Sequence, residues 1–128
     1  MKILGINFSH EASVCVIDGN DIVFYQEEQM LSGVKKDHRI NYLWNELKNN
    51  YFDSIVFTRA KVNQEESEEL KKYIIHSCDQ YNITFKNIRC DFNHHLQHAA
   101  SSFYNSPFDK AYCLVMDGSG NHYYFNKN

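Results

Sequence analysis

"SVCVIDGNDIVFYQEE" (residues 13–28) decides how the fold begins, because two runs rich in β-branched and aromatic residues flank one turn signal. That signal is Asp-Gly-Asn at residues 18–20, where Gly and Asn accept positive φ angles cheaply and favour a tight hairpin. The preceding stretch "KILGINF" (residues 2–8) is another short apolar run. We therefore predict three consecutive antiparallel strands at the start of the chain.

The rest of the chain alternates between helical and extended apolar patterns. Helices are predicted over residues 40–51 and 63–81, and strands over residues 53–59, 83–89 and 110–117. A third helix is predicted between a cap at Asp91 or Asn93 and Pro107, and a returning strand after residue 120. The predicted order is β-β-β-α-β-α-β-α-β-β, in one compact α/β unit whose mixed sheet is flanked by helices.

Composition excludes several classes of protein. The 128 residues are 43% hydrophobic, 15% aromatic and 23% charged, which is typical of one globular domain and not of a disordered chain. The formal net charge is −3 and no dense Lys/Arg cluster occurs, which argues against a nucleic-acid partner. No apolar run approaches the roughly 18 residues that a membrane span needs. The four cysteines form no C-x-x-C pair and no export signal precedes them, so we expect reduced thiols and a cytoplasmic location.

The stretch "NHHLQHAASSFY" (residues 93–104) has three histidines among its first six residues. On a helix, His94 and His98 are four residues apart and share a face, so both rings can meet one cation. Neutral imidazole is a common ligand for iron, zinc and similar ions. A zinc protease would need a glutamate where His95 stands, so the sequence disfavours that enzyme.

Asp117 is the best candidate for a third ligand. It ends a predicted buried strand, and the Gly-Ser-Gly that follows lets backbone amides approach a bound molecule closely. Two plainer interpretations stay open, since histidine pairs also occur on helix surfaces without a metal and Asp-Gly also forms ordinary hairpin turns.

Two further stretches place polar residues where loops are expected. "INFSHEAS" (residues 6–13) puts His10 at the exit of a strand, a position from which it can contact an oxyanion or phosphate. "YQEEQMLSGVKKDHR" (residues 25–39) puts Lys35 and Lys36 near a glycine, where a lysine can bind phosphate or carboxylate as a point charge. Both stretches also fit solvated loops without a function.

Taken together, these stretches resemble the N-terminal part of the O-carbamoyltransferases of the nodulation-protein and antibiotic-tailoring type. "LGINFSHEASVCVIDGNDIVFYQEEQ" (residues 4–29) is similar to the family's H-D/E-x-S, V-x-D-G-x-I-V and Q-E-E-R motifs. "HHLQHAASSFYNSPFDKAYCLVMDGSG" (residues 94–120) is similar to its H-H-L-x-H-A-x-S-A-F-x-x-S-P-F and D-G-x-G motifs. The resemblance extends over essentially the whole chain and is weakest between about residues 42 and 87.

The resemblance implies an actin/Hsp70-like (ribonuclease-H-like) lobe, in the version shared with threonylcarbamoyl-adenosine synthases. It implies a divalent metal, iron first and zinc or manganese as alternatives, on His94, His98 and Asp117. It also implies that His10 and Lys35 handle carbamoyl phosphate or carbamoyl-adenylate. The residues expected beside the phosphates of ATP are Gly118, Ser119 and Gly120.

The implied reaction is ATP-dependent. Carbamoyl phosphate gives carbamoyl-adenylate, whose carbamoyl group passes to a hydroxyl of a sugar or another small molecule. The family's fourth metal ligand, second lobe and adenylate-forming domain are expected beyond Asn128, so we expect the isolated chain to lack full activity and to pair with a second lobe or subunit.

The sequence departs from the family at a few positions, and other functions stay open. Gln29 replaces an arginine, "IN" at residues 40–41 replaces Phe-Pro, and the family lysine is either Lys35 or Lys36. One alternative is a non-catalytic half-domain that binds a metal or a partner. Another is a transferase that moves threonylcarbamoyl to transfer RNA, which the lack of a basic surface disfavours.

Overall fold

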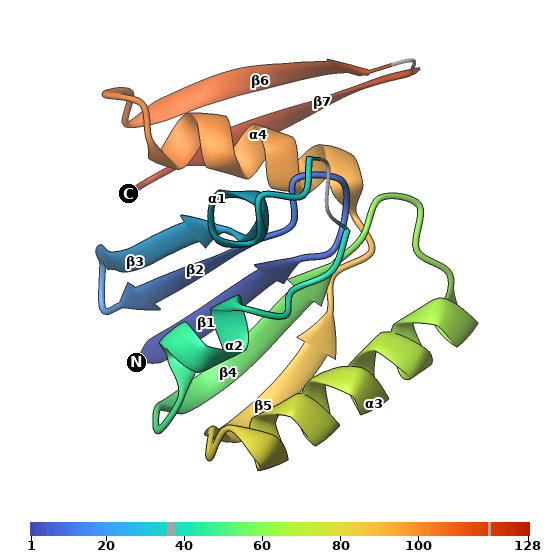
Figure 1. The fold of residues 1–128 in the computed structure, drawn as a ribbon. Coiled ribbons are helices and arrows are strands. Elements are labelled where there is room, and N and C mark those ends of the chain that lie inside the picture. The colour runs from blue at the N-terminus through green and yellow to red at the C-terminus, as the bar shows by residue number, and fades with distance from the viewer. Residues whose placement is uncertain (36–37, 118) are drawn as a thin grey trace. The chain divides into compact units, whose positions relative to one another are not determined.

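The three opening strands form as predicted, as β1 (Lys2–Asn7), β2 (Ser13–Asp18) and β3 (Asp21–Glu27). The computed structural model describes residues 1–35, 38–117 and 119–128 (Figure 1). β1 pairs antiparallel with β2, and β2 pairs antiparallel with β3. Gly19 in the connecting turn has a φ of 63°, the left-handed conformation that the Asp-Gly-Asn signal predicts.

Two parallel strands complete a mixed sheet. β4 (Tyr51–Thr58) lies parallel to β1, and β5 (Thr84–Cys90) lies parallel to β4, in the order β3-β2-β1-β4-β5. Parallel neighbours need a crossover, and α3 (Gln64–Gln80) provides the one between β4 and β5. The predicted mixed α/β architecture, with a mixed sheet and flanking helices, is therefore confirmed.

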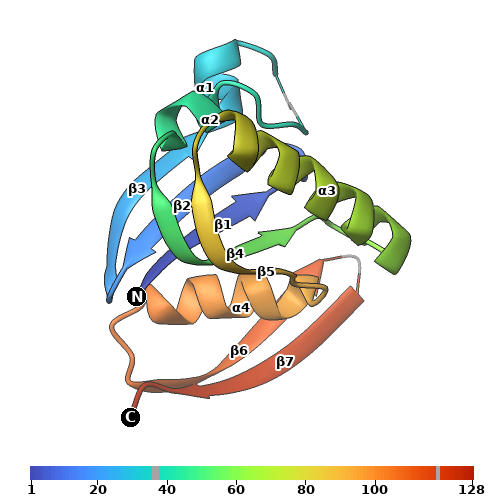
Figure 2. The ribbon, with the colours of Figure 1, turned by 90° about the horizontal axis from the view of Figure 1, so that it is seen from below.

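Helices cover one side of this sheet. α1 (Glu28–Ser32), α2 (Leu43–Leu47) and α3 lie on the same side of the five strands (Figure 2). Alternate residues of the strands point into the core there, because successive strand side chains face opposite sides. The fully buried members of this core include Leu4, Val14, Ile40, Leu43, Phe52, Ile55 and Ile74.

The first predicted helix is shorter in the structure than its apolar pattern indicated. The pattern predicted a helix over residues 40–51, whereas α2 covers only Leu43–Leu47. The Glu28 carboxylate accepts backbone N–H bonds from Asn41, Tyr42 and Leu43, so the chain turns into the helix only there. Asn49 then adopts a φ of 66°, which ends the helix and turns the chain into β4. The short helix α1 has too few residues for a periodic pattern and was not predicted.

Residues 93–128 form a smaller assembly of one helix and one hairpin. α4 (His94–Tyr104) is followed by β6 (Lys110–Asp117) and β7 (Ser119–Asn126), which pair antiparallel in a two-stranded sheet. The ring of Phe103 is buried and stacks on Phe125 with centroids 5.2 Å apart. Those two residues belong to α4 and β7, so the helix packs on the hairpin.

The structure separates the chain into two compact units, where the sequence predicted one. The first is Met1–Phe92 and the second is Asn93–Asn128. The difference arises because β6 pairs with β7, in a sheet of their own, and not with the five-stranded sheet. Among the described residues, no helix combines the length and the apolar character that crossing a membrane requires.

Candidate metal centre

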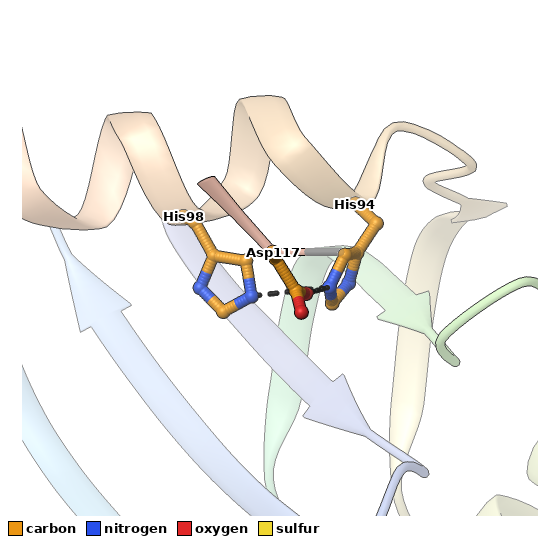
Figure 3. Close-up of side chains that lie close together, drawn as sticks. All are labelled: His94, His98 and Asp117. Atoms are coloured by element: carbon orange, nitrogen blue, oxygen red, sulfur yellow. Dashed lines mark hydrogen bonds and ion pairs between the residues drawn. The ribbon is translucent and has the colours of Figure 1, made fainter. Parts of the chain in front are cut away.

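The site begins with the start of α4. Asn93 caps the helix, since its side-chain oxygen accepts the backbone N–H of Leu96 at 3.1 Å. The helix then begins at His94, so His94 and His98 lie one turn apart on one face. Their rings point toward the same space, as the sequence predicted (Figure 3).

Asp117 reaches this space from the end of β6. Its Oδ2 atom lies 3.1 Å from His94 Nε2, and His94 Nε2 lies 3.1 Å from His98 Nε2. The three residues each offer one ligand atom, and these atoms all lie within 4.8 Å of one another (Figure 3). The structure thus brings together the three residues that the sequence predicted as ligands.

The electrostatics of the cluster favour an ionised carboxylate. The hydrogen bond from His94 lowers the pKa of Asp117 below its usual value, against a smaller opposing effect of desolvation. The nearby rings of His98 and His95 lower the same pKa further. The Asp117 side chain is 61% exposed, so the cluster is open to solvent and to an entering ion.

The donor set fits a small divalent cation. Two bonds of about 2.1 Å that meet at roughly 95–110° hold their donor atoms about 3.1–3.4 Å apart. The two 3.1 Å separations around His94 lie at the short end of that range. A single ring nitrogen of His94 faces both other residues, so without a cation one N–H proton has to serve two acceptors. A cation instead takes one lone pair from each of the three donors.

Two hydrogen bonds that the sequence did not suggest surround the first helical turn. The side-chain amide nitrogen of Asn121 lies 2.6 Å from His95 Nδ1, and Tyr123 donates its hydroxyl to Asn93 Oδ1 at 3.3 Å. Asn121 and Tyr123 alternate along β7, so both face the helix. The sequence predicted the returning strand that contains both residues. Its odd-numbered residues share a face with Asp117, but this follows only from the hairpin register, which the sequence does not specify.

The two predicted catalytic residues lie in the first unit. His10 is exposed in the turn after β1, and Lys35 is exposed in the loop after α1. The ring of His10 contacts the ring of His38 edge to face, with centroids 6.4 Å apart. No sequence signal connects these two histidines, because they come from separate loops. Ser9 secures the turn beside His10 by accepting the backbone N–H of Ala60 at 2.8 Å.

The predicted phosphate-binding stretch is only partly described. Gly118 and the side chain of Ser119 lie outside the described residues, as does Lys36, the alternative to Lys35. Gly120 is exposed in β7 opposite Met116, where a Cβ atom would meet the backbone oxygen of Val115 at 3.3 Å. A side chain at this position would therefore crowd the hairpin.

Comparison with known proteins gives a match to one family model. Residues 70–127 match the family described as the carbamoyltransferase N-terminus. This match supports the resemblance found in the sequence. The matched segment contains His94, His98 and Asp117, whereas His10 and Lys35 lie outside it.

No curated protein matches the chain. Among solved structures, the chain is similar to YeaZ from Pseudomonas aeruginosa with a TM-score of 0.39 and 12% sequence identity. That match covers 98% of this chain and 66% of the YeaZ chain.

Proposed function

We propose that this chain supplies the metal-binding part of a carbamoyltransferase active site. The observation that carries the proposal is the convergence of His94, His98 and Asp117 within the segment that matches the family. The helical spacing of the two histidines in the sequence supports the same choice of residues. The five-stranded order β3-β2-β1-β4-β5 supports the further proposal that the first unit is an actin/Hsp70-like lobe.

The ligands we propose are the two Nε2 atoms of the imidazoles and one oxygen of the carboxylate. Iron fits this set, as do zinc and manganese, because imidazole and carboxylate donors accept several divalent ions. When bound, such an ion polarises a carbonyl oxygen or lowers the pKa of a coordinated hydroxyl. The protein contributes the fixed helical spacing of the histidines and a carboxylate that is already ionised.

We propose that His10 and Lys35 hold the phosphate group of carbamoyl phosphate, and that Gly118, Ser119 and Gly120 approach the phosphates of ATP. His10 and Lys35 are both exposed on loops, and neither side chain is part of the core. This position suits groups that bind a soluble dianion. Positive groups at these positions would stabilise the negative charge that leaves with the phosphate. The carbamoyl group would then pass to a hydroxyl of a small molecule or sugar.

Metal binding is the first test. Anaerobic titration of the full chain with iron(II), and with cobalt(II) as a coloured substitute, should show one site per chain. His94→Ala should weaken binding by more than about 100-fold, because changes in the outer hydrogen-bond partners alone typically weaken metal binding 10–100-fold. His76→Ala is the matched control, since His76 is an exposed histidine on α3, outside the cluster. Equal binding by the two variants would refute the metal centre.

Substrate binding is the second test. Phosphorus NMR should detect carbamoyl phosphate binding to the wild-type chain, and His10→Ala and Lys35→Ala should each weaken it about 10-fold. Lys72→Ala, an exposed lysine on α3, should leave it unchanged. Strong metal binding without any binding of carbamoyl phosphate would favour the alternative, a metal-binding half-domain without turnover.

A further inference from the structure

Besides the contact between Asp117 and His94, two further side-chain hydrogen bonds join β7 to the start of α4. Asn121 bonds to His95, and Tyr123 bonds to Asn93. Asn93 and His95 are the immediate neighbours of His94 in the chain. The first turn of the helix is therefore connected to β7 on both sides of the residue that contacts Asp117.

The hairpin register carries this restraint to Asp117. Asn121 of β7 pairs with Val115 of β6. Asp117 comes only two residues after Val115 in β6, and it pairs with Ser119. Asp117 is otherwise exposed, and its own side chain contacts His94. An unrestrained hairpin end would frequently lose a single solvent-exposed contact of this kind, since such contacts contribute little free energy.

The bond to Asn121 also gives His95 a different role from its neighbour His94. An amide nitrogen only donates, so His95 Nδ1 is the acceptor and the ring proton lies on Nε2. The lone pair of Nδ1 is then occupied, which directs His95 away from metal ligation although its ring centroid lies 5.8 Å from that of His94. His94 and His98 keep their Nε2 atoms directed into the cluster.

We propose that Asn121 and Tyr123 are positioning residues, which hold the end of the hairpin against the helix start so that Asp117 joins the two histidines. This inference rests on the proposed metal centre. Tyr123 strengthens the cap at Asn93, whose side-chain oxygen also accepts the backbone N–H of Leu96. Asn121 fixes the neighbouring histidine, and together they set the distance between strand and helix.

The test is a set of cobalt(II) titrations of the full chain, followed by the visible absorption of the bound ion. Asn121→Ala combined with Tyr123→Phe should weaken binding about 10–100-fold and change the spectrum, because one ligand is lost. In an Asp117→Asn background, the same pair of substitutions should change affinity less than about 3-fold, since the ligand that it positions is already gone. Tyr124→Phe is the matched control, because it removes a hydroxyl from the opposite face of the same strand.

Equal losses in both backgrounds would overturn the inference, since the two residues would then act on the fold as a whole. A second readout needs no metal. Nuclear Overhauser contacts between Asp117 and the His94 ring should be present in the wild-type and Tyr124→Phe chains and lost in the Asn121→Ala/Tyr123→Phe chain. Their persistence at full intensity would refute the positioning role. If the wild-type chain binds no cobalt, the proposed function fails, and this second readout still decides the positioning role.

Discussion

Glu28 is the residue on which the loop between α1 and α2 depends. It is fully buried, and its carboxylate accepts three backbone N–H groups, from Asn41, Tyr42 and Leu43, at 2.7, 3.1 and 3.1 Å. One side chain therefore caps α2 and closes the loop that contains Lys35. The sequence showed Glu28 only as part of a family motif, because a carboxylate partnered by distant backbone groups leaves no local pattern.

Removing this carboxylate should destabilise the first unit strongly. Glu28→Ala leaves three backbone donors without their partner, and we expect a loss of roughly 3 kcal/mol or more in the free energy of unfolding. Denaturant unfolding followed by circular dichroism measures this loss. Glu46→Ala removes an exposed glutamate from α2 and should change the free energy of unfolding by less than about 0.5 kcal/mol. Similar losses in both variants would show that the capping role is wrong.

The pKa of Asp117 gives a prediction about pH. The pKa of Asp117 in the folded chain lies below its usual value of 3.8, first because of the hydrogen bond from His94. A lowered folded pKa means that the contact stabilises the fold above the unfolded pKa and is lost as the pH falls through the folded pKa. Carbon NMR of the metal-free chain should therefore give an Asp117 midpoint below 3.8, which His94→Ala should raise. An unchanged midpoint in that variant would contradict the contact.

Thiol reactivity should separate the cysteines. Burial raises the pKa of Cys78 from 9.0 to about 11, and the thiolate is the reactive form. We expect Cys78 to react with iodoacetamide at pH 8 far more slowly than the half-exposed Cys113. Mass spectrometry of partly labelled chains gives the order, and early labelling of Cys78 in the folded chain would contradict its burial in the core.

At the scale of elements, the periodic segments were predictable and the short ones were not. α3 follows its predicted range to within one residue at each end, because 17 residues contain enough turns for a clear pattern and Asn63 provides a cap. α1 has only five residues, and α2 is shortened by the carboxylate of Glu28, which is distant in the sequence. The local sequence therefore does not determine the length of either helix. The histidine helix was predictable as an element, whereas its bonds to β7 depend on a hairpin register that only the folded chain reveals.

The two asparagine caps allow a matched comparison between helices. Asn63 and Asn93 each accept the backbone N–H three residues later, at 2.8 and 3.1 Å. Asn63→Ala and Asn93→Ala should each cost about 1 kcal/mol in the stability of their own helix. Only Asn93→Ala should also weaken cobalt binding, because α4 carries two of the proposed ligands, His94 and His98, and α3 carries none. Loss of cobalt binding in both variants would point to a general effect of stability.

At the scale of the whole molecule, the two units differ in how much apolar surface they bury. The large buried cluster consists of residues of Met1–Phe92, whereas the buried hydrophobic residues of the second unit are Ala99 and Phe103 among those described. The composition of the chain is typical of one globular domain, but it does not specify this uneven distribution of buried residues. That distribution follows from the separate pairing of β6 and β7, which no periodicity in the sequence specifies.

Metal binding should therefore protect the second unit selectively. A ligand present at 100 times its dissociation constant stabilises the bound state by about 2.7 kcal/mol. We expect cobalt to slow amide hydrogen exchange in α4, β6 and β7 and to leave exchange in the core of the first unit nearly unchanged. The Asp117→Asn chain should show much less protection. Uniform slowing across both units would contradict separate local opening.

The uneven core has a consequence for how such a protein can change over generations. Most substitutions destabilise a fold, and selection removes those that lower its stability too far. The buried residues whose substitution destabilises this fold most belong to Met1–Phe92. Exposed residues of the proposed metal centre, such as His98 and Asp117, can be exchanged at little cost to folding. Drift and selection can therefore change the exposed residues of α4 and the end of β6 while the five-stranded sheet keeps its structure.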